Sequence, residues 1–207
     1  MNILNFFIHA AIFVFSLVIH EIAHARTAYY LGDSTAKNMG RFSPNPLKHI
    51  SLIGILLPIG LYFAGMPMFG FAKPVPYNPI YFKQPKRDMI FVGLAGPLSN
   101  FLLAILTLLV LGIFQAYSIT YFNNILGYML VVNLVLCFFN LIPIPPLDGS
   151  IIYMSSIINK NQALAQKLTW FCSGMLLYII VFLPLTGDNL IARYMQWCIN
   201  TLLSLLH

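Results

Sequence analysis

The chain has 207 residues, of which 59% are hydrophobic and only 8% are charged. Soluble domains carry about 25% charged residues, so this composition excludes an ordinary soluble protein and indicates a membrane protein. The formal charge of +6 comes from basic residues between apolar runs, without the basic and aromatic stripe that binds nucleic acid. We therefore expect the lipid bilayer, and no nucleic acid, as a partner.

Apolar segments follow one another along the chain. A helix needs about 20 apolar residues to cross a bilayer. The sequence predicts spans over about residues 4–25, 89–117, 125–146 and 168–185. The first lacks the basic start of a signal peptide, so we expect it to be a retained transmembrane helix.

Two further apolar segments are ambiguous. Residues 50–64 are short for a span and contain Pro58, so we expect a broken, tilted or partly re-entrant element there. Residues 190–206 contain Arg193 and Gln196, so this segment is expected either to span or to lie in the interface. The fold class is thus an all-α polytopic membrane protein with about five or six transmembrane or re-entrant helices.

We expect one integral-membrane domain over residues 1–207, with a core at 1–158 and C-terminal helices at 159–207. The connecting segments 26–49 and 66–88 each carry four basic residues. They lie on opposite sides if residues 50–64 span; if those residues re-enter, both lie on one side, which is then cytoplasmic. Three prolines in GFAKPVPYNP (70–79) predict an extended ribbon or loop.

The sequence HEIAH, at the end of the first apolar run, carries three ionisable groups. His20 and His24 are one helical turn apart, so both can bind one ion. Glu21 lies about 100° around the helix, where it reaches a water on that ion without binding the metal itself. Two histidines and a glutamate in this spacing are typical of zinc hydrolases. The alternative is a hydrogen-bonded histidine pair at a helix end.

A catalytic zinc needs a third protein ligand and an open position. Asp148 is the best candidate, because it lies between apolar stretches with no basic residue nearby. The prolines of NLIPIPPLDG break the preceding helix and allow the chain to turn this carboxylate inward. The alternative is an N-cap for the segment that begins at Gly149. Asp33 and Asp88 lie in contexts that turns and helix caps explain.

Together, HEIAHA (20–25) and NLIPIPPLDG (140–149) resemble the motifs of the site-2 protease family of intramembrane zinc metalloproteases. The segments around GFAKPVPYNP and VGLAGPLSN resemble the small subgroup that lacks PDZ and CBS domains. The similarity covers residues 14–155 approximately.

The resemblance implies specific roles. His20, His24 and Asp148 would bind one Zn²⁺ per chain, and Glu21 would be the catalytic base. Asn140 matches a family asparagine that assists substrate binding or the transition state, and a carboxamide can donate to a developing oxyanion. The alternative for Asn140 is an interhelical hydrogen bond. Asn100 offers a similar amide, for which packing or capping is the simpler interpretation.

The resemblance implies an intramembrane endopeptidase that cleaves transmembrane protein or peptide substrates in regulated intramembrane proteolysis. The expected location is the cell membrane, as a multi-pass protein of a bacterial inner membrane. Because ionisable residues in spans also mark ion paths, the alternative is a metal or proton transporter or channel that uses the same His/Asp cluster. A third reading is a catalytically inactive binder of membrane proteins. The sequence does not settle the oligomeric state.

Overall fold

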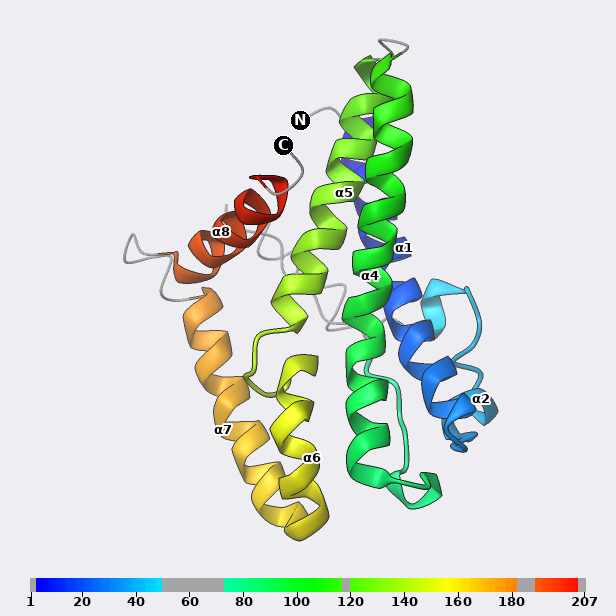
Figure 1. The fold of residues 1–207 in the computed structure, drawn as a ribbon, viewed down its shortest axis with the longest axis vertical. Coiled ribbons are helices and arrows are strands. Elements are labelled where there is room, and N and C mark those ends of the chain that lie inside the picture. Colours follow the sequence, from blue (N-terminus) through cyan, green and yellow to red (C-terminus); the bar gives the residue numbers. More distant parts are fainter. Residues whose placement is uncertain (1–2, 50–72, 117–119, 182–188, 205–207) are drawn as a thin grey trace.

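A computed structural model describes residues 3–49, 73–116, 120–181 and 189–204. Over these ranges the chain is helical and contains no strand, which confirms the predicted all-α fold (Figure 1). In chain order its helices are α1 (Ile3–Tyr30), α2 (Thr35–Asn38), η1 (Pro46–Lys48), η2 (Pro79–Tyr81), α4 (Pro85–Ala116), α5 (Thr120–Asn140), η3 (Asp148–Ser150), α6 (Ile151–Lys160), α7 (Gln162–Val181) and α8 (Leu190–Ser204).

Three long helices form the centre of the molecule. α4 and α5 run side by side in opposite directions, and α1 packs against both of them (Figure 1). The pair α6 and α7 lies beside the lower half of α4, and α8 packs against α5. Any functional group on α1 that faces inward is therefore enclosed by α4 and α5.

Four of the described helices are long and apolar enough to cross a membrane, namely α1, α4, α5 and α7. They match the four predicted spans, although the predicted bounds were wrong in detail. α1 continues to Tyr30, and α4 begins at Pro85 and passes through Pro97 without ending. α5 begins at Thr120 and ends at Asn140, before the proline cluster. The predicted element at 50–64 lies outside the described residues.

Two aspartates close turns at the ends of the helices. At the start of α4, the backbone N–H of Gln84 donates to Oδ2 of Asp88 at 2.9 Å. In the turn between α1 and α2, the N–H of Thr35 donates to Oδ1 of Asp33 at 2.8 Å. Both aspartates therefore cap or close turns, as their sequence contexts predicted.

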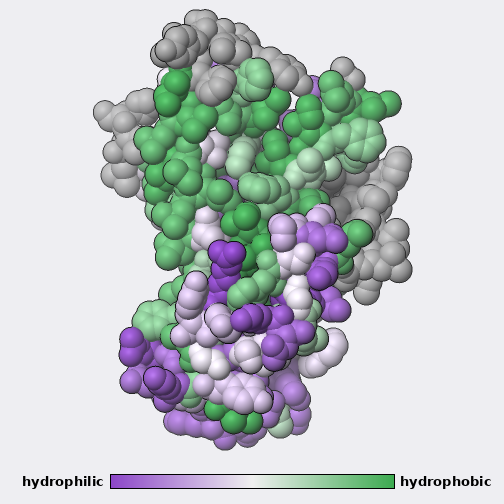
Figure 2. Space-filling view, turned by 90° about the vertical axis from the view of Figure 1, so that its right-hand side faces the viewer, coloured by the Kyte–Doolittle hydropathy of each residue, from purple (hydrophilic) through white to green (hydrophobic). Residues whose placement is uncertain are grey.

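The surface is divided between an apolar body and a polar end (Figure 2). The C-terminal end of α1 and the start of α4 share one hydrophobic cluster, which includes Ala28, Phe82 and Met89, so the described residues that flank this cluster in the two basic segments lie close together. The N–H of Lys73 donates to the carbonyl of His49 at 2.6 Å, and Arg41 donates to the carbonyl of Lys48 at 2.6 Å. His49 and Lys73, which border residues 50–72, are therefore hydrogen-bonded to each other.

The segment between α5 and α6 turns back toward α1. α5 ends at Asn140, and Asp148 opens the short helix η3 that leads into α6. A Cβ atom at Gly149 would overlap the backbone carbonyl of Leu141, so only glycine permits this close approach. The turn places the carboxylate of Asp148 opposite the inward face of α1.

Candidate metal centre

α1 presents His20, Glu21 and His24 to the interior of the bundle. All three residues are buried, with 4%, 7% and 7% of their surface exposed. The two histidines are one helical turn apart and their rings are nearly perpendicular, with centroids 4.7 Å apart. The helical spacing predicted from the sequence therefore places both imidazoles in one site.

Asp148 completes this cluster. Its Oδ2 atom lies 3.0 Å from Nε2 of His20 and 3.3 Å from Nε2 of His24. The two Nε2 atoms lie 3.1 Å from each other. The carboxylate faces the histidines, whereas the N-cap alternative required it to face the backbone N–H groups of the following helix.

α4 contacts the opposite side of both imidazole rings. Nδ1 of His20 lies 2.6 Å from Oδ1 of Asn100, and Nδ1 of His24 lies 2.6 Å from the carbonyl oxygen of Val92. Gly96 lies between these two contacts, and a Cβ atom there would come within 2.6 Å of Nε2 of His20. α4 therefore fits against the imidazoles only because position 96 carries no side chain.

The three facing atoms fit a tetrahedral metal ion. With each Nδ1 bonded to an oxygen, the two Nε2 atoms present lone pairs, and so does the carboxylate. Oδ2 of Asp148 is buried without a hydrogen-bond donor among the described residues. Zinc ligands at about 2.0–2.1 Å in tetrahedral geometry are about 3.3–3.4 Å apart, close to the separations given above. The donor set is suited to zinc, with two imidazole nitrogens and one carboxylate oxygen.

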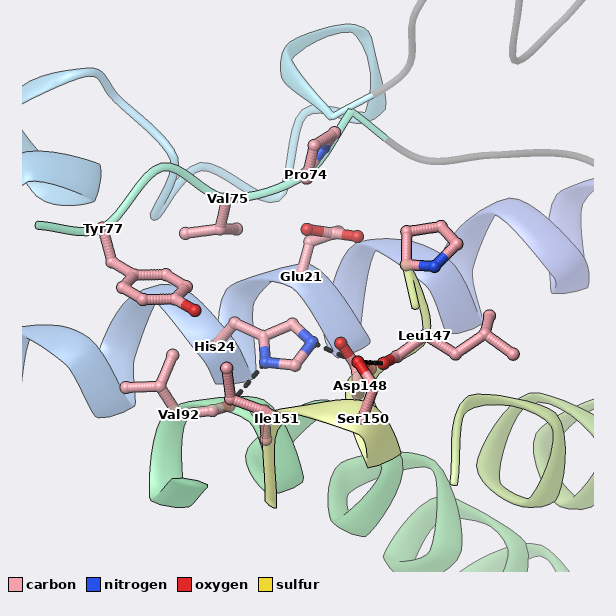
Figure 3. A pocket seen from close by; sticks show the side chains of 12 residues that line it. Glu21, His24, Pro74, Val75, Tyr77, Val92, Leu147, Asp148, Ser150 and Ile151 are labelled. Carbon is pink, nitrogen blue, oxygen red and sulfur yellow. Dashed lines mark hydrogen bonds and ion pairs between the residues drawn. The ribbon is translucent and has the colours of Figure 1, made fainter. Parts of the chain in front are cut away.

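Glu21 lies beside the cluster but is not part of it. Its Oε2 atom is buried and has no hydrogen-bond partner among the described residues. The side chain lines a pocket of about 230 Å³ together with His24 and Asp148 (Figure 3). A carboxylate in this position can accept a proton from a molecule in the pocket.

Residues 73–78 form another wall of this pocket. They are neither helix nor strand, which agrees with the predicted ribbon, and residues 70–72 of that ribbon lie outside the described part. Pro74, Val75 and Tyr77 line the pocket, and the hydroxyl of Tyr77 points into it (Figure 3). Burial raises the pKa of Tyr77 above its ordinary value of 10.0, and the Asp148 carboxylate raises it further. The hydroxyl therefore stays protonated and can donate a hydrogen bond.

Asn140 and Asn100 have different positions. Asn140 is the last residue of α5, and its amide donates to the carbonyl of Leu136 in the same helix at 2.9 Å. It is not among the residues that line the pocket, and its role with the substrate stays a prediction. Asn100, for which packing was the simpler interpretation, contacts His20 directly.

Several residues of the site were not predicted. Asn133 on α5 and Ser16 on α1 continue the hydrogen bonds from Asn100, and all three are fully buried. Asn133 stands alone in an apolar run, and a polar residue in a span is a signal that would have found it. Val92 acts through its main-chain carbonyl, which has no signal in a side-chain pattern.

Similar proteins are named as zinc metalloproteases. The chain is 34% identical to "Putative zinc metalloprotease YwhC" of Bacillus subtilis, over 89% of this chain and 81% of that protein. It is 31% identical to "Putative zinc metalloprotease Rip2" of Mycolicibacterium smegmatis, over 88% of this chain and 69% of that protein. It is 29% identical to "Zinc metalloprotease MJ0392" of Methanocaldococcus jannaschii, over 85% of this chain and 42% of that protein. No family model and no solved structure matches the chain.

Proposed function

The chain belongs to the zinc metalloprotease family of YwhC and Rip2, and on this premise we propose that it is an intramembrane zinc endopeptidase. Its substrates would be membrane proteins, cleaved in or near their transmembrane segments, as in the site-2 proteases that its motifs resemble. One observation carries the proposal. Three ligand atoms and a buried glutamate converge inside helices that are long and apolar enough to span a bilayer.

His20, His24 and Asp148 would hold one zinc ion per chain. When bound, zinc acts as a Lewis acid and lowers the pKa of a water molecule at its open position. The neutral imidazoles and the single carboxylate leave a net charge of +1 on such a centre, which favours an approaching carbonyl oxygen. The low-dielectric interior strengthens this attraction.

Glu21 would act as general base and then as general acid. Its carboxylate would take the proton of the attacking water as the water oxygen bonds to the peptide carbonyl carbon. It would then return that proton to the amide nitrogen as the C–N bond breaks, so that a carboxylic acid and an amine leave. The buried Oε2 atom, unpaired among the described residues, supports this role.

Tyr77 would stabilise the negative charge that develops on the carbonyl oxygen. Its neutral hydroxyl points into the pocket, which is bounded by Glu21, His24 and Asp148 (Figure 3). A fixed donor aimed at a developing oxyanion lowers the barrier to hydrolysis. Asn140 is the second candidate for this role, with the amide proton that is not donated to Leu136.

A helical substrate must unwind before it is cleaved, because its carbonyls are bound within the helix. The extended segment 73–78 lines the pocket, where main-chain pairing with an extended substrate is feasible. We include this pairing in the proposal, and a structural covering loop is the alternative.

The proposed location is a bacterial inner membrane, with several spans. The end of α1 and the start of α4, with the described basic residues around them, lie close together, and this end would face the cytoplasm. The active-site helix reaches this end only a few residues after His24, at Arg26. Cleavage would then take place nearer to the cytoplasmic than to the outer surface.

The first experiment compares wild type with Glu21→Gln on a model transmembrane substrate, with zinc content measured in both. We expect equal zinc, and cleavage at least about 100-fold slower in the variant, because general base catalysis contributes about 10²–10⁴. Cleavage by the variant at the wild-type rate would refute the role of Glu21. Zinc-dependent ion flux in liposomes, without cleavage of any substrate, would favour the transporter alternative.

A further inference from the structure

We propose that Asn100 and Asn133 are positioning residues that fix the tautomer of His20, so that its Nε2 lone pair points at the metal. The proposal rests on the proposed zinc site. The two asparagines and Ser16 form a buried chain of hydrogen bonds that joins α5, α4 and α1. The chain ends on Nδ1 of His20.

The hydrogen-bond partners of Asn133 fix the orientation of its side-chain amide. Its Nδ2 atom lies 2.9 Å from the carbonyl oxygen of Met129 and 3.0 Å from Oγ of Ser16. A carbonyl oxygen only accepts, so the atom that faces it must be the amide nitrogen. The side-chain oxygen of Asn133 is thereby turned toward α4.

The orientation of the Asn100 amide follows from its own hydrogen-bond partners. Its Nδ2 atom donates to Oδ1 of Asn133 at 2.9 Å and to the carbonyl of Ser16 at 3.3 Å. Both of these partners are acceptors, and together they use both amide protons. The side-chain oxygen of Asn100 is left to face His20.

The orientation of Asn100 determines which nitrogen of the His20 ring carries the proton. Oδ1 of Asn100 can only accept, so Nδ1 of His20, 2.6 Å away, must carry the proton. A neutral ring with its proton on Nδ1 has a lone pair on Nε2. This atom lies 3.0 Å from Oδ2 of Asp148 and 3.1 Å from Nε2 of His24. The hydrogen-bond chain therefore selects the tautomer that binds metal.

His24 is held in the same tautomer, but by a backbone carbonyl instead of a side chain. Its Nδ1 atom lies 2.6 Å from the carbonyl oxygen of Val92, which is also only an acceptor. This contact belongs to the backbone of α4 and survives side-chain substitution. The contact of His20 depends on a side chain, so substitution at position 100 isolates the effect of one tautomer.

The test separates this role from simple packing between helices. Asn100→Leu removes the acceptor for His20, whereas Asn100→Asp keeps an acceptor and loses the amide donors to Asn133 and Ser16. Loss of a hydrogen bond behind a metal-bound histidine lowers metal affinity by about 10- to 100-fold. Thr107→Val is the control, because Thr107 is buried on α4 and its hydroxyl donates to the carbonyl of Leu103 in the same helix at 2.7 Å.

The measurement is zinc affinity of the purified full chain, by competition with a chelator, together with thermal stability in detergent. We expect a loss of about 10- to 100-fold in Asn100→Leu, and affinities close to wild type in Asn100→Asp and Thr107→Val. Equal losses in both Asn100 variants would overturn the proposal and leave a packing role. Failure of the wild type to bind zinc would overturn the proposed metal site as well.

A second measurement determines the tautomer in the wild-type protein, and a variant serves only to assign its signals. The ¹⁵N spectrum of histidine-labelled wild type, loaded with zinc, distinguishes coordination through Nε2 from coordination through Nδ1. His20→Ala identifies the signals of His20. We expect coordination by Nε2 with a proton on Nδ1, and coordination of His20 through Nδ1 would overturn the proposal.

Discussion

The backbone N–H of Asn78 donates to Oδ2 of Asp33 at 2.6 Å, and this bond joins the turn after α1 to the extended segment that lines the pocket. Oδ1 of the same carboxylate accepts from the N–H of Thr35 at 2.8 Å. Asp33 is fully buried. One side chain thus holds the segment that carries Tyr77 in register with the helix that carries the proposed metal ligands His20 and His24.

Substitution of this carboxylate should release the segment. In Asp33→Ala the N–H of Asn78 loses its partner, and an unsatisfied buried donor costs about 1–3 kcal/mol. We expect faster hydrogen exchange at residues 73–78 and slower cleavage, with zinc content unchanged. The control is Asn45→Ala, which removes a similar but exposed turn contact to the N–H of Leu47. Unchanged exchange at Asn78 would show that other contacts hold the segment.

Removal of Asp148, the third proposed ligand, should abolish tight zinc binding. Asp148→Asn keeps the size of the side chain but replaces a carboxylate by a weaker, neutral ligand. We expect a loss of zinc affinity beyond the 10- to 100-fold range of outer hydrogen bonds. Asp88→Asn is the control, because it changes a capping carboxylate at the start of α4. Zinc bound equally by Asp148→Asn and wild type would exclude Asp148 as a ligand.

An added methyl group at Gly96 should disrupt the site sterically. The new Cβ atom would come within 2.6 Å of Nε2 of His20, so α4 or the ring must move. We expect Gly96→Ala to lose zinc and activity. Gly112→Ala is a matched control on the same helix, because a Cβ atom there has no neighbour within 4 Å among the described residues. Wild-type zinc affinity in Gly96→Ala would mean that the helices separate at little cost.

The hydroxyl of Tyr77 should affect turnover rather than binding. Tyr77→Phe keeps the ring, which stacks on Phe82 with centroids 6.0 Å apart, and removes the donor. We expect kcat to fall by about 100-fold, the effect of losing one oxyanion donor, with KM and zinc content nearly unchanged. Tyr81→Phe is the control, since Tyr81 lies in η2, directly after this segment, and is 58% exposed. A rise in KM alone would make Tyr77 a substrate contact.

The same tyrosine gives a pH prediction. Its pKa is raised by burial and by Asp148, so the folded protein keeps the phenol proton above the ordinary value of 10.0. The contribution of protonated Tyr77 to the stability of the folded protein is complete below pH 10.0. It is lost as the pH rises through the higher pKa of the folded state. Wild type should therefore lose more stability than Tyr77→Phe above pH 10, measured as thermal unfolding in detergent.

Much of this arrangement follows from local patterns. The helical period places His20 and His24 on one face, and the apolar length of each run predicts the four spans. The ambiguity about the basic segments could not be resolved from charge, because each carries four basic residues. Contacts across the chain, such as that between His49 and Lys73, bring described residues of the two segments together, but residues 50–64 lie outside the described part.

The hydrogen-bond chain behind His20 was beyond prediction for a different reason. Asn133 and Ser16 are 117 positions apart, and their contact depends on how three helices are rotated about their axes. Apolar helices with little amphipathic character do not reveal that rotation in their sequence. The role of Val92 belongs to a backbone carbonyl, which every residue has.

α4 contacts the imidazoles of both His20 and His24, and these contacts would link metal binding to assembly of the bundle. Val92 and Asn100 are eight positions apart, about 12 Å along the helix axis, and both contacts require one register of α4 against α1. A ligand that binds only this register stabilises it in proportion to its affinity. Zinc would therefore strengthen the helix packing, and a chelator would weaken the same interface. The proposed zinc site would therefore be complete only once α1 and α4 are packed together in the bilayer.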